Sequence, residues 1–119
     1  MQDPMRIPKL YLDIVNQIFE IEKKANKLQE SNSIQRNINK LREILQNDLS
    51  EQSEEPAGLI YHNPIGEDYN ETRTDCEASI AGSSTENLKI TDVIKPIIRF
   101  NRGGISLIVQ KGIVVAEAI

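Results

Sequence analysis

The sequence predicts an α+β fold in which an N-terminal helical dimerisation region precedes a small antiparallel β-domain. Two observations predict it: apolar residues recur at heptad spacing up to residue 45, and beyond residue 57 the apolar period changes to two. An acidic, proline-ended segment separates the two patterns. We expect the helical region at residues 1–50, an acidic linker at 51–57 and the β-domain, or wing, at 58–119.

The first helical segment carries apolar side chains at spacings that alternate between four and three residues. They are Ile7, Tyr11, Ile14, Ile18, Ile21, Ala25 and Leu28. This heptad seam is typical of helices that pack on other helices. Leu10, Val15 and Phe19 widen it, as a helical bundle requires. Ser31-Asn32-Ser33 then interrupts the pattern, because these residue types favour caps and turns over helix interiors.

A second seam follows the interruption and lies one residue out of register with the first. It consists of Ile34, Ile38, Leu41 and Leu45, with Ile44 and Leu49 beside it. A continuous helix with a stammer would account for the offset, and so would a break with a helical hairpin, which we favour.

We expect no opposing element for either helix in a chain this short, so burial of both apolar stripes would require a second copy of the chain. We therefore expect a homodimer whose hairpins form a coiled-coil or four-helix bundle. The expected dimer interface is Ile7, Tyr11, Ile14, Ile18, Ile21, Leu28, Ile34, Ile38, Leu41 and Leu45.

The net charge of -4 is unevenly distributed along the 119 residues. Residues 1–45 carry +2, residues 46–88 carry -9 and residues 89–119 carry +3. The strongly acidic segment 46–88 would repel a phosphate backbone, so we do not expect nucleic acid as a partner. No apolar run approaches the ~20 residues of a transmembrane helix, so no membrane partner is expected either.

The C-terminal half contains short apolar runs bounded by turn residues. Candidate strands lie at 59–61 and 78–80, and the clearest lie at 93–100, 105–109 and 113–116. Gly103-Gly104 separates two of these runs and predicts a hairpin turn with positive φ. Pro96 cannot donate to a strand ladder, so it predicts an edge or a bulge. We expect a compact antiparallel sheet, separate from the helices.

The sequence contains few of the residue types and motifs that catalysis or metal binding requires. Cys76 and His62 are each the only residue of their type, too few for a disulfide or a zinc cluster. Asp75 and Glu77 flank Cys76 and would raise the pKa of a thiol that a nucleophile needs ionised. No phosphate-binding loop or calcium-loop spacing is present. We expect a protein that is not an enzyme, with no metal or cofactor, and the unpaired cysteine favours the cytoplasm.

Residues 58–116 resemble the wing of the GrpE family, the nucleotide exchange factors of DnaK-type chaperones. Gly58-Leu59-Ile60 resembles its opening strand, Asp68-Tyr69-Asn70 a turn, and Ile90–Pro96 the segment I-x-x-V-x-x-x-G-Y. Arg99–Gly104 resembles its hairpin turn, and 105–115 its closing strands. The family's Gly-Tyr pair falls here on Pro96-Ile97 or Ile97-Ile98, its His-x-Ala has no histidine, and most of its N-terminal stalk is missing.

The resemblance implies a homodimeric co-chaperone that binds the ATPase domain of a DnaK-type chaperone and promotes ADP release. The alternative is a non-catalytic coiled-coil adaptor whose β-domain docks another protein. Arg99 alternates with apolar neighbours, and Arg102 lies in the turn, so we expect both to contact the partner, with Asn101 between them. Arg73 is a weaker candidate, because it is the only cation in the acidic zone and pairing there is the alternative.

Overall fold

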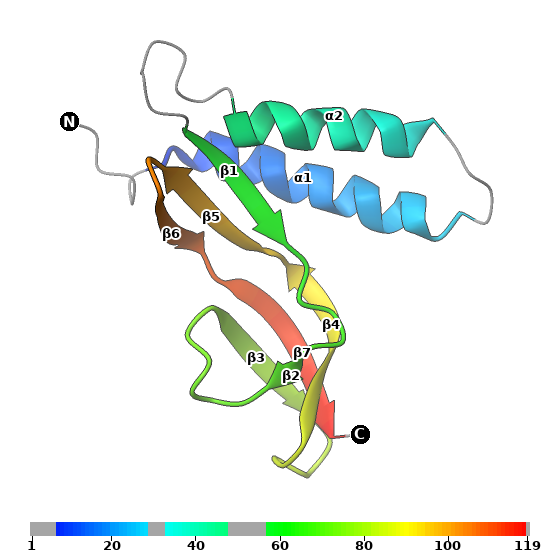
Figure 1. Cartoon of the computed structure of the whole chain (residues 1–119). Coiled ribbons are helices and arrows are strands. Elements are labelled where there is room, and N and C mark those ends of the chain that lie inside the picture. Colours follow the sequence, from blue (N-terminus) through cyan, green and yellow to red (C-terminus); the bar gives the residue numbers. More distant parts are fainter. Residues whose placement is uncertain (1–6, 29–32, 48–56, 119) are drawn as a thin grey trace.

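The computed structural model describes residues 7–28, 33–47 and 57–118, and within these ranges it confirms the α+β class. Two helices precede seven strands (Figure 1). The helices are α1 (Lys9–Asn26) and α2 (Ile34–Asn47). The strands are β1 (Ala57–His62), β2 (Asp68–Tyr69), β3 (Cys76–Ala81), β4 (Leu88–Lys95), β5 (Ile97–Arg102), β6 (Ile105–Gln110) and β7 (Gly112–Ala118).

The helices form a hairpin, so the break that we favoured over a stammered helix is confirmed. Pro8 immediately precedes α1, and its carbonyl accepts a hydrogen bond from the amide of Tyr11 at 3.0 Å. α1 ends at Asn26 and α2 begins at Ile34, and the two run side by side in opposite directions. The residues that we expected to break the helix lie between them, and Ser31 and Asn32 are outside the described residues.

The strands form two sheets, with orders β1-β5-β6 and β2-β4-β7-β3. The expected single antiparallel sheet is therefore wrong in two respects. The strands form two sheets, and β3 pairs with β7 in parallel. The reason is topological. The consecutive strands β3 and β4 run in opposite directions, and β7 inserts between them, so it must be parallel to one of the two.

Both sheets share two long bent strands. β4 continues into β5 across Pro96, and β6 continues into β7 across Lys111. We call this pair of bends the elbow, and we call the four-stranded sheet beyond it the arm. The arm extends away from the helices (Figure 1). The single strand expected at 93–100 is divided at Pro96 between β4 and β5, and an irregularity of the kind expected at Pro96 lies just before it, where the β4–β7 ladder shifts register between Val93 and Lys95.

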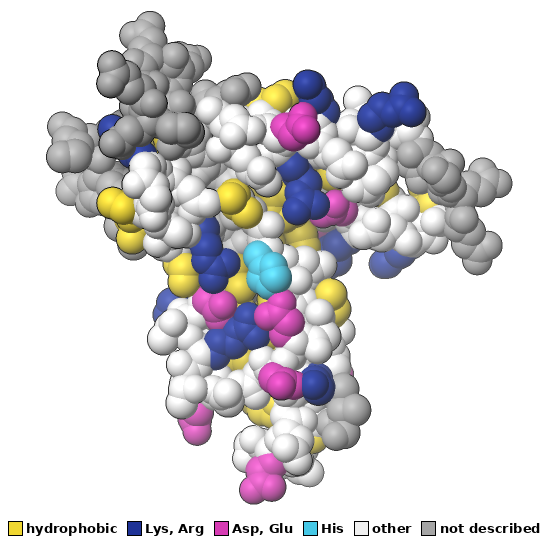
Figure 2. Space-filling view, viewed as in Figure 1, with side chains coloured by type: hydrophobic (Ala, Val, Ile, Leu, Met, Phe, Trp, Pro, Cys, Tyr) yellow, Lys and Arg dark blue, Asp and Glu magenta, His cyan; other side chains and the backbone are white. Residues whose placement is uncertain are grey.

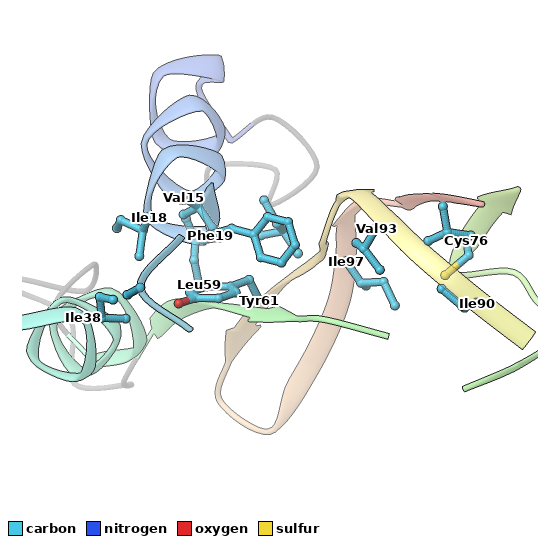
Figure 3. Packing of buried hydrophobic residues seen from close by; sticks show 13 residues of the cluster. Val15, Ile18, Phe19, Ile38, Leu59, Tyr61, Cys76, Ile90, Val93 and Ile97 are labelled. Atoms are coloured by element: carbon cyan, nitrogen blue, oxygen red, sulfur yellow. The ribbon is translucent and has the colours of Figure 1, made fainter. Parts of the chain in front are cut away.

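One continuous hydrophobic cluster runs from the helices into the arm (Figure 3). Phe19 of α1 and Tyr61 of β1 meet edge to face, with ring centroids 6.3 Å apart. Ile97, which is completely buried at the elbow, and Cys76 belong to the same cluster. Two expectations are therefore wrong: the helices do have an opposing surface, which is the β1-β5-β6 sheet, and the β-region is not separate from them.

A close backbone contact brings α2 against β1. A Cβ atom added at Gly58 would lie 1.9 Å from the carbonyl oxygen of Gln46. Nearby, Glu22 of α1 accepts hydrogen bonds from Tyr61 at 3.1 Å and from Arg42 at 3.4 Å, and Arg42 also lies over the Tyr61 ring. Burial and the neighbouring Glu22 raise the pKa of Tyr61, which keeps the phenol a hydrogen-bond donor.

The expected hairpin turn is confirmed at Gly103-Gly104. The φ angles of these residues are 54° and 83°, which place both in the left-handed region. Such angles at both central positions define a two-residue turn whose twist matches the flanking strands β5 and β6.

Candidate functional site

A cluster of charged side chains covers one face of the elbow. Figure 2 shows the histidine beside the acidic and basic side chains of this face. Arg73 pairs with Asp75 at 2.6 Å and with Glu67 at 2.7 Å, and His62 lies 2.5 Å from Glu67. Arg99 approaches Asp75 at 3.5 Å. We call these five residues the elbow cluster.

Backbone geometry brings the cluster together from four segments. His62 ends β1, Glu67 precedes β2, and Arg73 and Asp75 lie in the connection to β3. Arg99 lies in β5, and because strand side chains alternate it projects away from the face occupied by Ile98 and Phe100. The carbonyl of Asp75 also accepts a hydrogen bond from the amide of Gly112 at 2.9 Å, which ties the cluster to the elbow itself.

The pairing shifts the acidities within the cluster. Hydrogen bonding from Arg73 lowers the pKa of Asp75, although burial opposes this shift. Burial alone would raise the pKa of Glu67, but hydrogen bonds from Arg73 and His62 outweigh it and lower that pKa. The pKa of Arg73 is raised, chiefly by its hydrogen bond to Asp75. Both carboxylates therefore stay ionised to lower pH than ordinary carboxyl groups, and their ion pairs with Arg73 persist at neutral pH.

The structure places the four expected partner-contact residues in different environments. Arg99 and Arg73 meet through Asp75, and the Arg73 side chain is 17% exposed, so the pairing alternative for Arg73 describes its position. Arg102 is exposed at the end of β5. Asn101 is half-buried, and its Oδ1 is buried with no hydrogen-bond partner among the described residues.

Sequence reasoning assigned no site role to Glu67 or Asp75 and so missed the acidic half of the cluster. A signal was present for one of them. Arg73 and Asp75 carry opposite charges only two residues apart, which favours a local ion pair. Nothing in the sequence indicated that Glu67 or Arg99 would join them.

The expected dimer residues divide into three groups. Ile18 and Ile38 are buried within the chain's own core. Ile7 and Leu45 are half-buried against that core. The remaining six are exposed: Tyr11, Ile14, Ile21, Leu28, Ile34 and Leu41. The exposed seam is therefore offset from the face that packs on the β1-β5-β6 sheet.

Outside the elbow cluster, the described ranges contain one buried cysteine and one open surface depression to consider. Cys76 is buried, and burial, with a smaller contribution from Asp75, raises the pKa of its thiol to about 11, which keeps it protonated. No group of three or more His, Cys, Asp or Glu residues in residues 7–28, 33–47 and 57–118 is placed to hold a metal ion. An open depression of about 410 Å³ lies along β2 and the start of β4, lined by Tyr69, Asn87 and Lys89 among others.

Neither described helix is long and apolar enough to span a bilayer. The chain matches no protein-family model, and no curated protein or solved structure is significantly similar to it.

Proposed function

We propose that this protein is a homodimeric, GrpE-like co-chaperone that binds the nucleotide-binding domain of a DnaK-type chaperone in the cytoplasm and promotes ADP release. One observation carries the proposal: the hairpin presents an apolar seam on the side not used by its own core, while the arm extends away from it. A second copy on the seam would leave both arms accessible to a partner.

The exposed seam is large enough for a dimer interface. We define an apolar stripe from the exposed Leu and Ile side chains of this region: Leu10, Ile14 and Ile21 on α1, Leu28 just after α1, and Ile34, Leu41 and Ile44 on α2. Each of these side chains is 41% to 65% exposed. With about 180 Å² for a fully exposed Ile or Leu, the stripe offers about 600 Å² per protomer, near the ~800 Å² per partner of a standard interface. The heptad spacing of Ile14 and Ile21 on α1 suits another helix.

Exchange activity needs no catalytic group. A protein that binds the open nucleotide cleft of a chaperone more tightly than the closed one shifts the chaperone towards the open state. A preference of about 3 kcal/mol would speed ADP release about a hundredfold where opening limits release. This role requires a binding surface and no reactive group, and the described residues offer such surfaces.

The contact that we propose lies along β5 and its turn. Arg102 is exposed there, and Arg99 is partly exposed while Asp75 holds it at the surface of the elbow. Asn101 lies between them in β5 and is half-buried, so it contributes only the exposed part of its side chain. Arginine suits such an interface because its planar head donates several hydrogen bonds in a fixed geometry. Arg73 supports Arg99 through their shared Asp75.

The dimer is tested by charges placed on the stripe. The double substitution Ile14→Asp and Ile21→Asp should give a monomer in sedimentation, because it buries unpaired charges in the dimer but leaves the core untouched. Asp substitutions of exposed Asn26 on α1 and Asn39 on α2, which lie on helix faces outside the stripe, are the matched control and should remain dimeric. An unmutated protein that sediments as a monomer at micromolar concentration contradicts the dimer.

The partner is tested by ADP release from a DnaK-type chaperone. Arg99→Glu with Arg102→Glu should slow association and abolish acceleration of release. The control Lys95→Glu with Lys111→Glu makes the same charge change at other exposed positions of the β-region and should retain activity. Equal activity in the two double variants removes β5 from the contact.

The adaptor remains the second candidate, and one observation favours it. The positions matching the family's Gly-Tyr pair, Pro96-Ile97 or Ile97-Ile98, are buried in the core. No tyrosine is available there for a partner. An unmutated dimer that neither binds a DnaK-type ATPase domain nor accelerates ADP release would favour the adaptor.

A further inference from the structure

Strand ladders of both sheets shift register next to the elbow. The β4–β7 register shifts between Val93 and Lys95, and the β5–β6 register shifts between Ile98 and Arg99. Gly112 lies between these irregularities, where an added Cβ would be 3.0 Å from Ile97 and 3.2 Å from Cys76. The elbow is tightly packed, but the hydrogen-bond ladders β4–β7 and β5–β6 are irregular beside it.

Two side chains of α1 hydrogen-bond to this joint. Asn16 and Gln110 exchange a reciprocal pair of amide hydrogen bonds at 3.0 and 2.9 Å, and Gln110 also donates to the carbonyl of Pro96 at 2.9 Å. Lys23, two helical turns further along α1, donates to the carbonyl of Val93 at 2.9 Å. Its ammonium also lies 5.3 Å from the centre of the Phe19 ring.

These contacts reach both bent strands at the elbow. Gln110 ends β6 immediately before Lys111, and Val93 lies in β4 three residues before Pro96. Together they satisfy two carbonyl groups next to the bend. On another face, Asp75 pairs with Arg99 and accepts the Gly112 amide, but all three of these residues belong to the β-region. Within the described residues, the hydrogen bonds of Asn16 and Lys23 add polar links between α1 and the elbow to the apolar packing there.

We propose that α1 acts as a brace that sets the angle between the arm and the helical hairpin, through Asn16 and Lys23. The arm is joined to the rest of the molecule by the two bent strands and by the chain between β1 and β2. Without the brace the two sheets keep their own hydrogen bonds, while the elbow gains freedom to bend. The inference goes beyond the proposed function, because it concerns arm orientation whatever the partner is.

The experiment measures the distance between the helices and the arm. Spin labels are placed by Arg36→Cys on α2 and Ser79→Cys on β3, both exposed positions. Cys76 stays unlabelled because its thiol is 4% exposed. Labelled chains are diluted with unlabelled ones, so that pulsed electron–electron double resonance spectroscopy reports distances within one chain even if the protein dimerises.

The brace variant Asn16→Ala with Lys23→Met should give a distance distribution about twofold broader than the unmutated protein, because the elbow samples more angles. The control Gln17→Ala with Lys24→Met makes the same type of change at the adjacent exposed positions of α1 and should leave the distribution narrow. Circular dichroism verifies that the helices and strands persist in both.

Equal distributions in the brace and control variants would overturn the proposal. If the double variant loses secondary structure, Lys23→Met alone decides, since methionine keeps an unbranched apolar stem beside Phe19 and removes the donor to Val93. A folded Lys23→Met protein with a broadened distribution supports the brace. A folded Lys23→Met protein with an unchanged distribution overturns it.

Discussion

The two sheets are made largely from the same pair of bent strands, but they are covered in different ways. The β1-β5-β6 sheet packs on helices, with Val15, Phe19 and Ile38 completing its core. The arm buries its own apolar residues Ile90, Val93 and Val114, and the loop before β2 bonds to β4: the amide of Gly66 donates to the carbonyl of Ile90, and the amide of Ile90 donates to the carbonyl of Glu67. The difference indicates that packing against the helices maintains the first sheet, while the arm depends on its own apolar residues, backbone bonds and ion pairs.

The largest test of this comparison is Phe19→Ala. Removing a buried aromatic side chain should lower the free energy of unfolding by about 3–5 kcal/mol, because transfer energy is lost and a cavity remains. Denaturant unfolding measures the total loss. Hydrogen exchange locates it, and we expect amides of β1 and β5 to lose more protection than amides of β3 and β7. An equal loss of amide protection in both sheets would show that packing against the helices stabilises the first sheet no more than the arm.

A smaller effect is expected from Gly58→Ala. The added methyl group would overlap the backbone of Gln46, so α2 must move away from β1. Overpacking of this kind should reduce the free energy of unfolding by about 2 kcal/mol. Thermal unfolding by circular dichroism measures the change. An unaltered melting temperature would show that α2 can shift without loss of packing.

The smallest effect is expected in the arm, from Asp75→Asn. Because the pKa of Asp75 is lowered on folding, its ionisation stabilises the fold above the unfolded pKa, near 3.8, and this contribution disappears as pH falls through the folded value. The variant should lose about 1 kcal/mol at neutral pH and show a weaker acid dependence. Denaturant unfolding at several pH values measures both. Glu77→Gln, at an exposed neighbouring carboxylate, is the control, and an identical acid profile in the two variants would contradict the assignment.

Local chemistry accounts for the parts of the fold that the sequence predicted well. The helical hairpin follows from the polar break after the first seam, and the turn at Gly103-Gly104 follows from residues that tolerate positive φ. Pro96 interrupts a strand because it lacks an N–H. Each of these signals acts over a few neighbouring residues, so no knowledge of distant contacts was needed.

By itself, the sequence determined the element types, the helical break, the hairpin turn and the apolar faces of the helices. Tertiary structure alone decided what those faces meet. Val15 and Phe19 widen the seam in a way that suits either a second helix or a sheet, because periodicity identifies a buried side without identifying its partner. The parallel β3–β7 pair and the meeting of Arg99 with Asp75 likewise join segments far apart in the chain. Such contacts depend on how the elements assemble in space, which short-range sequence patterns do not encode.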